Sequence, residues 1–365
     1  MNPKIPWWSP CVTSEDYVMV KNVLDSNYLN EGEITSEFER RIANLVGAKH
    51  AVATTSGTSA LFLALAAAGI GPGDEVIVPD VTFIATANAV RLASASPVLV
   101  DVDPLSLNID PAAIVSALTG RTKAVIAVHV SGRSADMPAI LKIAGSHNLV
   151  VVEDAAEAFM SSIDGRYLGT LGNLGCLSFS PNKTITSGQG GMVLTDDDAL
   201  HARLRELKDQ GRPVRGTGGD DIHFSVGYNF KLTNLQAAVG LGQLSALPQR
   251  LERQKRIYSL YSENLQGMDG IRLPGFRIDK GEVPQWTDAI VDRRDELDAY
   301  LADRDICCRR FWFPIHTQRP YLMDDDKFPA SSRLMPRALW LPSAFTLTDR
   351  DVLTVCRQIE EFFRI

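Results

Sequence analysis

One lysine of this chain stands in a pattern that is typical of covalent amine chemistry. Lys183 lies in SFSPNKTITSGQGGMV, between a short apolar run and a glycine-rich turn. Asp154 lies about thirty residues earlier, in VVEDAAEA. Together they predict a Schiff base between the lysine and pyridoxal 5'-phosphate (PLP), with the carboxylate paired to the pyridine nitrogen. Alone, the lysine would indicate only a solvated surface charge.

A cluster of small hydroxyl residues could bind the phosphate of such a cofactor. Four residues follow an expected strand at 50–54 and precede an expected helix: Ser56, Gly57, Thr58 and Ser59. Free amides and hydroxyls at the positive end of a helix favour anions, although an ordinary helix cap uses the same residue types. Ser178, five residues before Lys183, could add a hydroxyl to the same anion or be a buried serine with its own partner.

Two residues suit the ring of the cofactor. Asp154 ends an expected strand, and carboxylates at the carboxyl edge of a parallel sheet commonly meet ligands. A carboxylate would keep the pyridine nitrogen protonated, so that the ring can accept electrons when a proton leaves the substrate's α-carbon. The alternative for Asp154 is a helix cap. Phe83, in DVTFIATAN, offers a flat face for stacking or is a core residue.

The segments that would position these residues alternate between strand and helix patterns. Expected strands lie at 50–54, 75–79, 97–101, 124–128 and 149–153, and expected helices at 59–68, 84–92, 111–118 and 137–147. This alternation predicts an α/β domain with a mostly parallel sheet. Two further runs, at 176–179 and 191–195, flank the Lys183 loop and are expected to continue the sheet as a hairpin.

A second, smaller α/β domain is expected towards the C-terminus. A helical pattern at 235–265, interrupted near Pro248, leads into it. Strand-like runs follow at 286–291 and 306–309, and helical runs at 294–304 and 349–363. We therefore expect a PLP-binding large domain over 1–250 and a small C-terminal domain over 251–365.

Composition narrows the class of protein. The chain has 365 residues, 45% of them hydrophobic, and a net charge of -7, which argues against a nucleic-acid partner. Its five cysteines show no CxxC spacing, so we expect reduced thiols, no metal site and a cytoplasmic location. The N-terminal MNPKIPWWSP has no apolar signal core and no later run is long enough to span a bilayer, so no membrane association is expected.

Six segments resemble the DegT family of sugar aminotransferases, a branch of the type I PLP fold, and the resemblance runs over nearly the whole chain. They are TTSGTSAL at 54–61, VTFIATANAV at 81–90, VHVSGRSADM at 128–137, VVEDAAEA at 151–158, SFSPNKTITSGQGGMV at 178–193 and GYNFKLTNLQAAVGLGQL at 227–244. The family match implies Lys183 as the Schiff-base lysine, Asp154 as the partner of the pyridine nitrogen and Phe83 as the stacking ring. A related branch, the sugar 3-dehydratases, carries histidine in place of the lysine, so Lys183 favours transamination.

The resemblance also implies how the phosphate is held and how the chain assembles. Thr58, Ser59 and Ser178 would bind the phosphate within one subunit. Asn229, in GYNF, matches a residue that the family contributes to the phosphate site of a neighbouring subunit. A homodimer with shared active sites follows from that match.

Some positions depart from the family or point to the substrate. Glu157 stands where many relatives carry glutamine near the phenolic oxygen of the cofactor, so it must be protonated, turned away or bridged by water. RRFWFPIHTQRPY at 309–321 resembles a sugar-facing segment, which makes His316 and Arg309 substrate-site candidates. Arg310 replaces an expected proline, and the loop at 212–223 differs from that of relatives.

The leading hypothesis is transfer of an amino group from L-glutamate to a keto group of a nucleotide-linked 4-keto-6-deoxysugar, in two half-reactions. One alternative keeps the chemistry and takes a 3-ketosugar or a ketocyclitol as the acceptor. Another is a PLP-binding regulator without turnover, against which the intact Lys183 and Asp154 argue. A nicotinamide-dependent oxidoreductase would need a GxGxxG turn, and TTSGTSAL lacks that spacing.

Overall fold

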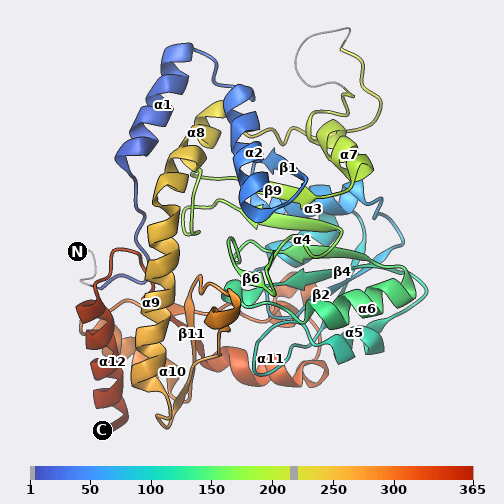
Figure 1. Cartoon of the computed structure of the whole chain (residues 1–365). Coiled ribbons are helices and arrows are strands. Elements are labelled where there is room, and N and C mark those ends of the chain that lie inside the picture. Colours follow the sequence, from blue (N-terminus) through green and yellow to red (C-terminus); the bar gives the residue numbers. More distant parts are fainter. Residues whose placement is uncertain (1–4, 214–220, 365) are drawn as a thin grey trace.

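A seven-stranded, mostly parallel sheet forms the centre of the larger part of the molecule (Figure 1). The computed structural model describes residues 5–213 and 221–364. In spatial order the strands are β1 (His50–Thr54), β9 (Gly191–Thr195), β8 (Leu174–Ser178), β5 (Val150–Asp154), β4 (Thr122–Val128), β2 (Glu75–Pro79) and β3 (Ser96–Val100). β9 pairs antiparallel with both β1 and β8, and the other neighbouring strands pair in parallel, so the predicted α/β class and the predicted β8–β9 pairing are confirmed.

Helices cover both faces of this sheet. Val76 and Val78 belong to the same apolar cluster as residues of α3 (Gly57–Ala67) and α4 (Ala85–Leu92). Ile77, between them, packs in the cluster that contains residues of α5 (Pro111–Ala117) and α6 (Met137–His147). Successive side chains of a strand point to opposite faces, so a wholly apolar run such as EVIVP is a strand buried on both sides.

A helical connection joins the large sheet to the C-terminal part of the chain. α1 (Ser14–Ser26) and α2 (Glu33–Val46) pack against α8 (Asn234–Gln243), and α9 (Leu247–Leu265) continues from α8 past α12 (Asp349–Arg364) (Figure 1). The interruption predicted near Pro248 lies at Leu244–Ala246. Pro248 itself stands in the first turn of α9, where a missing N–H costs no helical hydrogen bond.

The C-terminal part contains a small antiparallel sheet with its own apolar cluster. Its strands, in spatial order, are β10 (Ile271–Arg272), β11 (Thr287–Val291), β13 (Ala338–Leu341) and β12 (Arg309–Arg310). They pack with α9, α12 and α10 (Arg294–Ala302), while α11 (Pro329–Leu334) precedes β13. The strand expected at 306–309 is wrong in its bounds, because Ile306 pairs instead with Ile5. The domain division at residue 250 falls inside α9 and stays a prediction.

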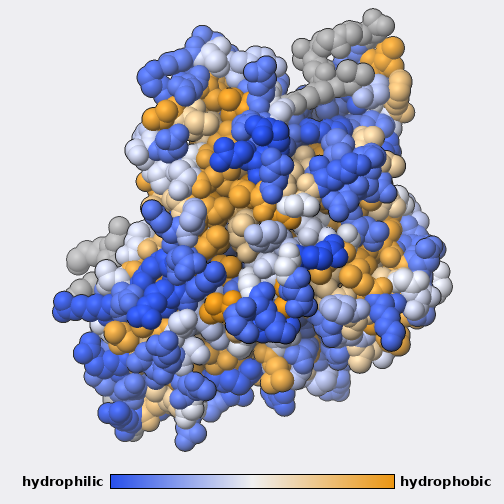
Figure 2. Space-filling model, viewed as in Figure 1, coloured by the Kyte–Doolittle hydropathy of each residue, from blue (hydrophilic) through white to orange (hydrophobic). Residues whose placement is uncertain are grey.

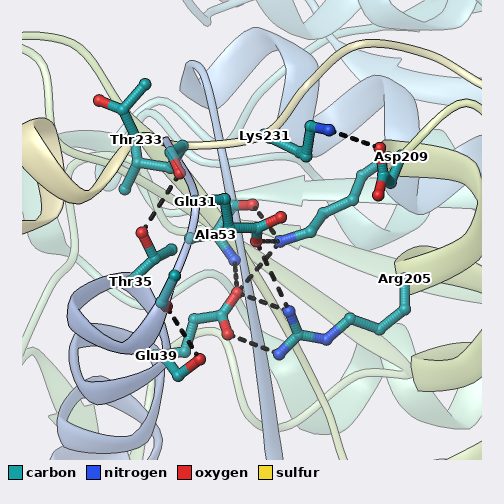
Figure 3. A network of polar contacts seen from close by, with 12 residues as sticks. Glu31, Thr35, Glu39, Ala53, Arg205, Asp209, Lys231 and Thr233 are labelled. Atoms are coloured by element: carbon teal, nitrogen blue, oxygen red, sulfur yellow. Dashed lines mark hydrogen bonds and ion pairs between the residues drawn. The ribbon is translucent and has the colours of Figure 1, made fainter. Parts of the chain in front are cut away.

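A buried ionic network ties α2 to β1 and to α7 (Asp198–Lys208), as Figure 3 shows. Glu39 accepts hydrogen bonds from the amide of Ala53 at 2.8 Å, from Arg205 at 3.0 Å and from Lys208 at 3.2 Å. Burial opposes ionisation of Glu39, but the charges of Lys208 and Arg205 outweigh it and lower the pKa of the carboxyl group. The network therefore fixes the strand that leads into the phosphate-binding candidates.

The remaining ordered pieces are short. β6 (Ser162–Ile163) and β7 (Arg166–Tyr167) form a small hairpin. The loop expected to differ from relatives, at 212–223, lies partly outside the described residues. Among the helices of the described residues, none combines the length and the apolar character needed to cross a lipid bilayer.

Candidate active site

A cavity of ≈ 330 Å³ lies at the carboxyl edge of the central sheet. It is bordered by the ends of β2, β4, β5 and β8 and by the first turn of α3, which is the edge where open α/β sheets bind ligands. Most of the residues that the sequence singled out line it, namely Gly57, Thr58, Phe83, Asp154, Glu157, Ser178, Lys183 and Arg309. Segments more than a hundred residues apart thus meet in one place.

Asp154 is a buried carboxylate at the floor of this cavity. It is the last residue of β5 and only 6% exposed. Its Oδ2 accepts a hydrogen bond from Thr86 Oγ1 at 2.8 Å, and its Oδ1 accepts one from the amide of Ala156 at 3.2 Å. Burial raises the pKa of Asp154, whereas the bond from Thr86 works in the opposite direction. A cationic partner in the cavity, such as a protonated pyridine nitrogen, would stabilise the ionised form.

Lys183 and Glu157 face each other across the same cavity. Lys183 Nζ donates to Glu157 Oε1 at 3.2 Å, with only 13% of the lysine side chain exposed. The indole N–H of Trp286 donates to the same oxygen at 3.2 Å, and the amide of Ser131 donates to Oε2 at 3.1 Å. Glu157 therefore lies beside Lys183 in the cavity, and the three alternatives for its place relative to the phenolic oxygen of the cofactor stay predictions.

The start of α3 lies very close to the end of β8. A Cβ added to Gly57 would lie 2.9 Å from Ser178 Cβ, so only glycine fits there without a shift. Ser56 and Ser59 form a capping box, in which the hydroxyl oxygen of each residue accepts a hydrogen bond from the backbone amide of the other. The backbone amides of Gly57 and Thr58 lie in the first turn of the helix, where N–H groups have no partner within the helix. They form the positive end of the helix dipole. These amides, with Ser178 Oγ, suit a phosphate group.

Three predicted site residues do not line the cavity. The hydroxyl of Ser59 donates to the carbonyl of Ser56 in the helix cap, and Asn229 forms a β-bridge with Asp209. His316 is fully buried, with Nδ1 at 2.7 Å from Asp80 Oδ2 and Nε2 at 3.0 Å from Asp325 Oδ1. Because Asp80 lies three residues before Phe83, His316 holds the segment that carries the stacking candidate.

An aromatic wall of the cavity escaped the sequence analysis. It consists of Trp7, Trp286, Trp312 and Trp340. Trp7 lies with its ring centroid 4.8 Å from that of Trp286 and 5.9 Å from that of Trp340, and Trp312 meets Trp340 edge-on at 5.2 Å. The WW pair at 7–8 was a visible signal, but the four tryptophans come from four separate segments, so their meeting could not be foreseen.

Arg309 is the cationic residue of this wall. Its guanidinium carbon lies 4.7 Å from the ring centroid of Trp7 and 5.4 Å from that of Trp340. Stacking on indole rings holds a guanidinium by its face and leaves the N–H groups at its edge for a planar anion. No ion pair of Arg309 with an acidic side chain occurs within residues 5–213 and 221–364. A carboxylate or phosphate of a substrate is therefore a suitable partner.

Comparison with known proteins agrees with this geometry. Residues 10–360 match the DegT/DnrJ/EryC1/StrS aminotransferase family. The chain belongs to this family. Membership confirms the predicted enzyme class, a PLP-dependent sugar aminotransferase. The solved structures that the chain resembles are PLP aminotransferases as well.

Individual relatives cover nearly the whole chain. The chain is 36% identical over 364 residues to GDP-perosamine synthase of Escherichia coli O157:H7, covering 98% of each protein. It is also 36% identical over 344 residues to UDP-N-acetyl-3-dehydro-alpha-D-glucosamine 3-aminotransferase of Acidithiobacillus ferrooxidans, covering 93% of this chain and 91% of that one. The crystal structure of S. venezuelae DesV in complex with a ketimine intermediate matches with a TM-score of 0.92 and 33% identity, covering 99% of both chains. The predicted type I PLP fold is thereby confirmed.

Proposed function

We propose that this family member transfers an amino group from L-glutamate to the keto carbon of a nucleotide-linked 4-keto-6-deoxysugar, with PLP held by its own cavity residues. The observation that carries the proposal is the placement of Lys183 and Asp154 on one cavity, beside the glycine-serine contact of α3 with β8. An amine, a buried carboxylate and an anion site at one sheet edge match the three reactive parts of that cofactor.

The residues present fit PLP at each of these parts. Asp154 would pair with the pyridine nitrogen, and Phe83, which is 53% exposed and lines the cavity, would offer its face to the ring. The amides of Gly57 and Thr58 and the hydroxyl of Ser178 would hold the phosphate. When bound, PLP withdraws electrons from the α-carbon of an attached amine, which makes the proton on that carbon removable.

Lys183 has two tasks in this proposal. Its amine holds the cofactor covalently, and once a substrate amine displaces it, the same Nζ accepts the proton that leaves the α-carbon. Glu157 keeps Nζ in place through its contact at 3.2 Å. Trp286 and Trp340 are each almost fully buried and would exclude water from that side of the cavity.

The relatives support a keto sugar as the acceptor and leave two positions for the new amine. The likeness to GDP-perosamine synthase supports the 4-keto-6-deoxysugar. The likeness to a 3-aminotransferase supports a second candidate, a 3-ketosugar linked to a nucleotide. In both cases Arg309 would bind an anionic group of the substrate at the tryptophan wall.

A homodimer with shared active sites is part of the proposal. Asn229 does not line the cavity of its own subunit, which is consistent with the role that the family gives this position across an interface. Large apolar side chains are exposed on the described surface, among them Tyr17, Val18 and Leu24 of α1. Figure 2 shows hydrophobic side chains reaching the surface in the middle of one face, between hydrophilic areas. Such patches favour association.

Absorbance spectroscopy tests the cofactor, the donor and the acceptor in one series. Wild-type protein and Lys183→Ala are loaded with PLP, and L-glutamate is then added, followed by either keto sugar. We expect a lysine-dependent visible band that glutamate removes and that the 4-keto-6-deoxysugar restores. Restoration by the 3-ketosugar alone would favour the second candidate, and the lack of any lysine-dependent band would overturn the proposal.

A further inference from the structure

The side chain of Gln285 contacts the two peptide groups that flank Lys183. Its Oε1 accepts hydrogen bonds from the backbone amide of Thr184 at 3.2 Å and from the hydroxyl of Thr184 at 2.7 Å. Its Nε2 donates to the carbonyl of Asn182 at 3.5 Å, which is a long contact. A backbone N–H can only donate, so Oε1 must face Thr184 and Nε2 must face Asn182. One side-chain amide thus spans the lysine residue.

These contacts fix the backbone of Lys183. The peptide group before the lysine is also held through its N–H, which donates to the carbonyl of Ser180 at 3.1 Å. The peptide group after it is held by the bond from Thr184 to Gln285. A residue has only two soft backbone dihedrals, and both are set once the peptide groups on either side are fixed. The direction of the Cα–Cβ bond of Lys183 is therefore set by the protein.

Gln285 is itself firmly placed. It is only 2% exposed, and its backbone amide donates to the carbonyl of Ser131 at 2.8 Å. The chain just before it packs closely on the same loop, because a Cβ added to Gly132 would lie 2.1 Å from the carbonyl oxygen of Val283. Gln285 directly precedes Trp286 and then β11, so the C-terminal part of the chain supplies the side chain that holds the lysine loop.

A charged bond holds the far side of the same threonine. Arg250 of α9 is 5% exposed, and its Nη1 donates to the carbonyl of Thr184 at 2.9 Å. Its Nη2 donates to the carbonyl of Cys11 at 2.9 Å. Hydrogen bonds from a guanidinium are stronger than those between neutral groups. The backbone on the C-terminal side of Lys183 is therefore held from two directions.

We propose that Gln285 is a positioning residue for Lys183, which keeps Nζ within reach of the substrate's α-carbon after a substrate amine has displaced the lysine. This inference rests on the proposed function, in which the freed Nζ accepts the proton of that carbon. Gln285 does not line the cavity, so it acts through the lysine and not on the substrate.

The need for such a residue follows from the freedom of a displaced lysine. A lysine side chain is a flexible four-carbon stem, and its amine is no longer tied at the far end once it has been displaced. Only the backbone of Lys183 and the walls of the cavity then place Nζ. A displacement of about 1 Å at a reacting group can cost about 100-fold in rate. A backbone fixed on both sides of the lysine removes two of the rotations that would allow such a displacement.

Single-turnover kinetics test the proposal. Wild-type protein and Gln285→Met are loaded with PLP and mixed with L-glutamate at increasing concentration, while the loss of the visible band is followed. Methionine has a similar length but no amide group. The maximal rate should fall about 10- to 100-fold, and the half-saturating glutamate concentration should change less than about twofold. A maximal rate within about twofold of the wild type, or a loss confined to the half-saturating concentration, would overturn the proposal.

Gln254→Met is the matched control. Gln254 is 3% exposed, and its Nε2 donates to the hydroxyl of Thr184 at 3.3 Å. Among the hydrogen bonds of the described residues, Gln254 has none to either peptide group that flanks Lys183. Its replacement should therefore leave the maximal rate unchanged. If Gln254→Met slows the reaction as much as Gln285→Met does, the effect comes from packing around Thr184 and the proposal is wrong.

Hydrogen exchange of the Thr184 amide provides a second test, made on cofactor-free protein and readable even if Gln285→Met does not fold. In the wild type this amide should be protected, because its partner is a side chain of the protein and not the cofactor. Gln285→Met should raise its exchange rate about five- to tenfold, as expected for one lost hydrogen bond, and Gln254→Met should not. Exchange in the wild type as fast as in an unstructured peptide would overturn the proposal.

The two tests separate this inference from the proposed function. A wild type that reacts with glutamate, beside a Gln285→Met protein that reacts equally fast, overturns the inference and leaves the proposed function standing. A wild type that forms no lysine-dependent band has lost the proposed function, and the positioning role falls with it.

Discussion

Gly57→Ala is the substitution that most directly tests the proposed anion site between α3 and β8. The added Cβ would lie 2.9 Å from Ser178 Cβ and 3.2 Å from Ser178 Oγ. Non-bonded carbons prefer separations of about 3.5–4.0 Å, so the contact is too short by roughly 0.6–1.1 Å. A Cβ cannot be moved by rotating a side chain, and the last residue of β8 is buried. Either the strand or the helix must therefore shift.

Two consequences follow from that shift. Overpacking of this size typically costs about 1–3 kcal/mol of unfolding free energy. A hydrogen bond to a charged group contributes about 1.5–3 kcal/mol, so the loss of one phosphate contact should weaken PLP binding roughly 10- to 100-fold. Binding is measured by titrating cofactor-free protein with PLP and following its absorbance, and stability by urea unfolding.

Gly145→Ala is the matched control. Gly145 is an exposed residue of α6, and a Cβ there would meet no atom within 4 Å. We expect this change to stabilise the protein by about 0.5–1 kcal/mol and to leave the affinity for PLP unchanged. A folded Gly57→Ala protein that binds PLP as tightly as the wild type would refute the assignment of the anion site.

Three further predictions concern other parts of the molecule. Lys208→Met leaves Glu39 buried without one of its cations (Figure 3) and should lower the unfolding free energy by about 3–5 kcal/mol in urea. Burial lowers the pKa of His201 from 6.5 to about 4, so between these pH values the unfolded chain binds more protons than the folded one. The unfolding free energy of the wild type should therefore fall as the pH is lowered from 6.5 to about 4. His201→Gln should lose less unfolding free energy over that range in urea titrations. Arg309→Met should raise KM for the anionic substrate in steady-state kinetics about tenfold or more while the affinity for PLP stays unchanged, and an unaltered KM would exclude Arg309 from substrate binding.

The parts of the fold that the sequence predicts are those with local causes. The strands at 50–54, 75–79 and 191–195 have the predicted bounds, because apolar runs between turn residues specify buried strands. The strand at 306–309 failed because a two-residue strand depends on its partner, and Trp340 and Leu339 lie thirty residues further along the chain. Some observed helix ends differ from the predicted ones by one or two residues, because capping residues set them. α3 begins directly after its cap Ser56, whereas the predicted helix began at residue 59.

The candidate site divides in the same way. Lys183, Asp154 and Ser178 could be picked out because each stands beside a strand end with a recognisable local pattern. The tryptophan wall and the burial of His316 could not, since they depend on contacts between distant segments. His316 pairs with Asp80, 236 residues away, and nothing near it in the sequence indicates that the ring is fully buried.

The N-terminal segment has a consequence for synthesis of the protein. The amide of Ile5 bonds to the carbonyl of Asp305 at 3.0 Å, and the carbonyl of Trp7 accepts from the amide of Ser343 at 2.9 Å. These backbone bonds of Ile5 and Trp7 thus form only after residues about three hundred positions further along the chain have been made. Ribosomes add about 5–20 residues per second, so the roughly 120 residues between Lys183 and Ile306 take roughly 6–25 s. During that time a nascent chain carries Lys183, the proposed Schiff-base lysine, before one wall of its cavity exists.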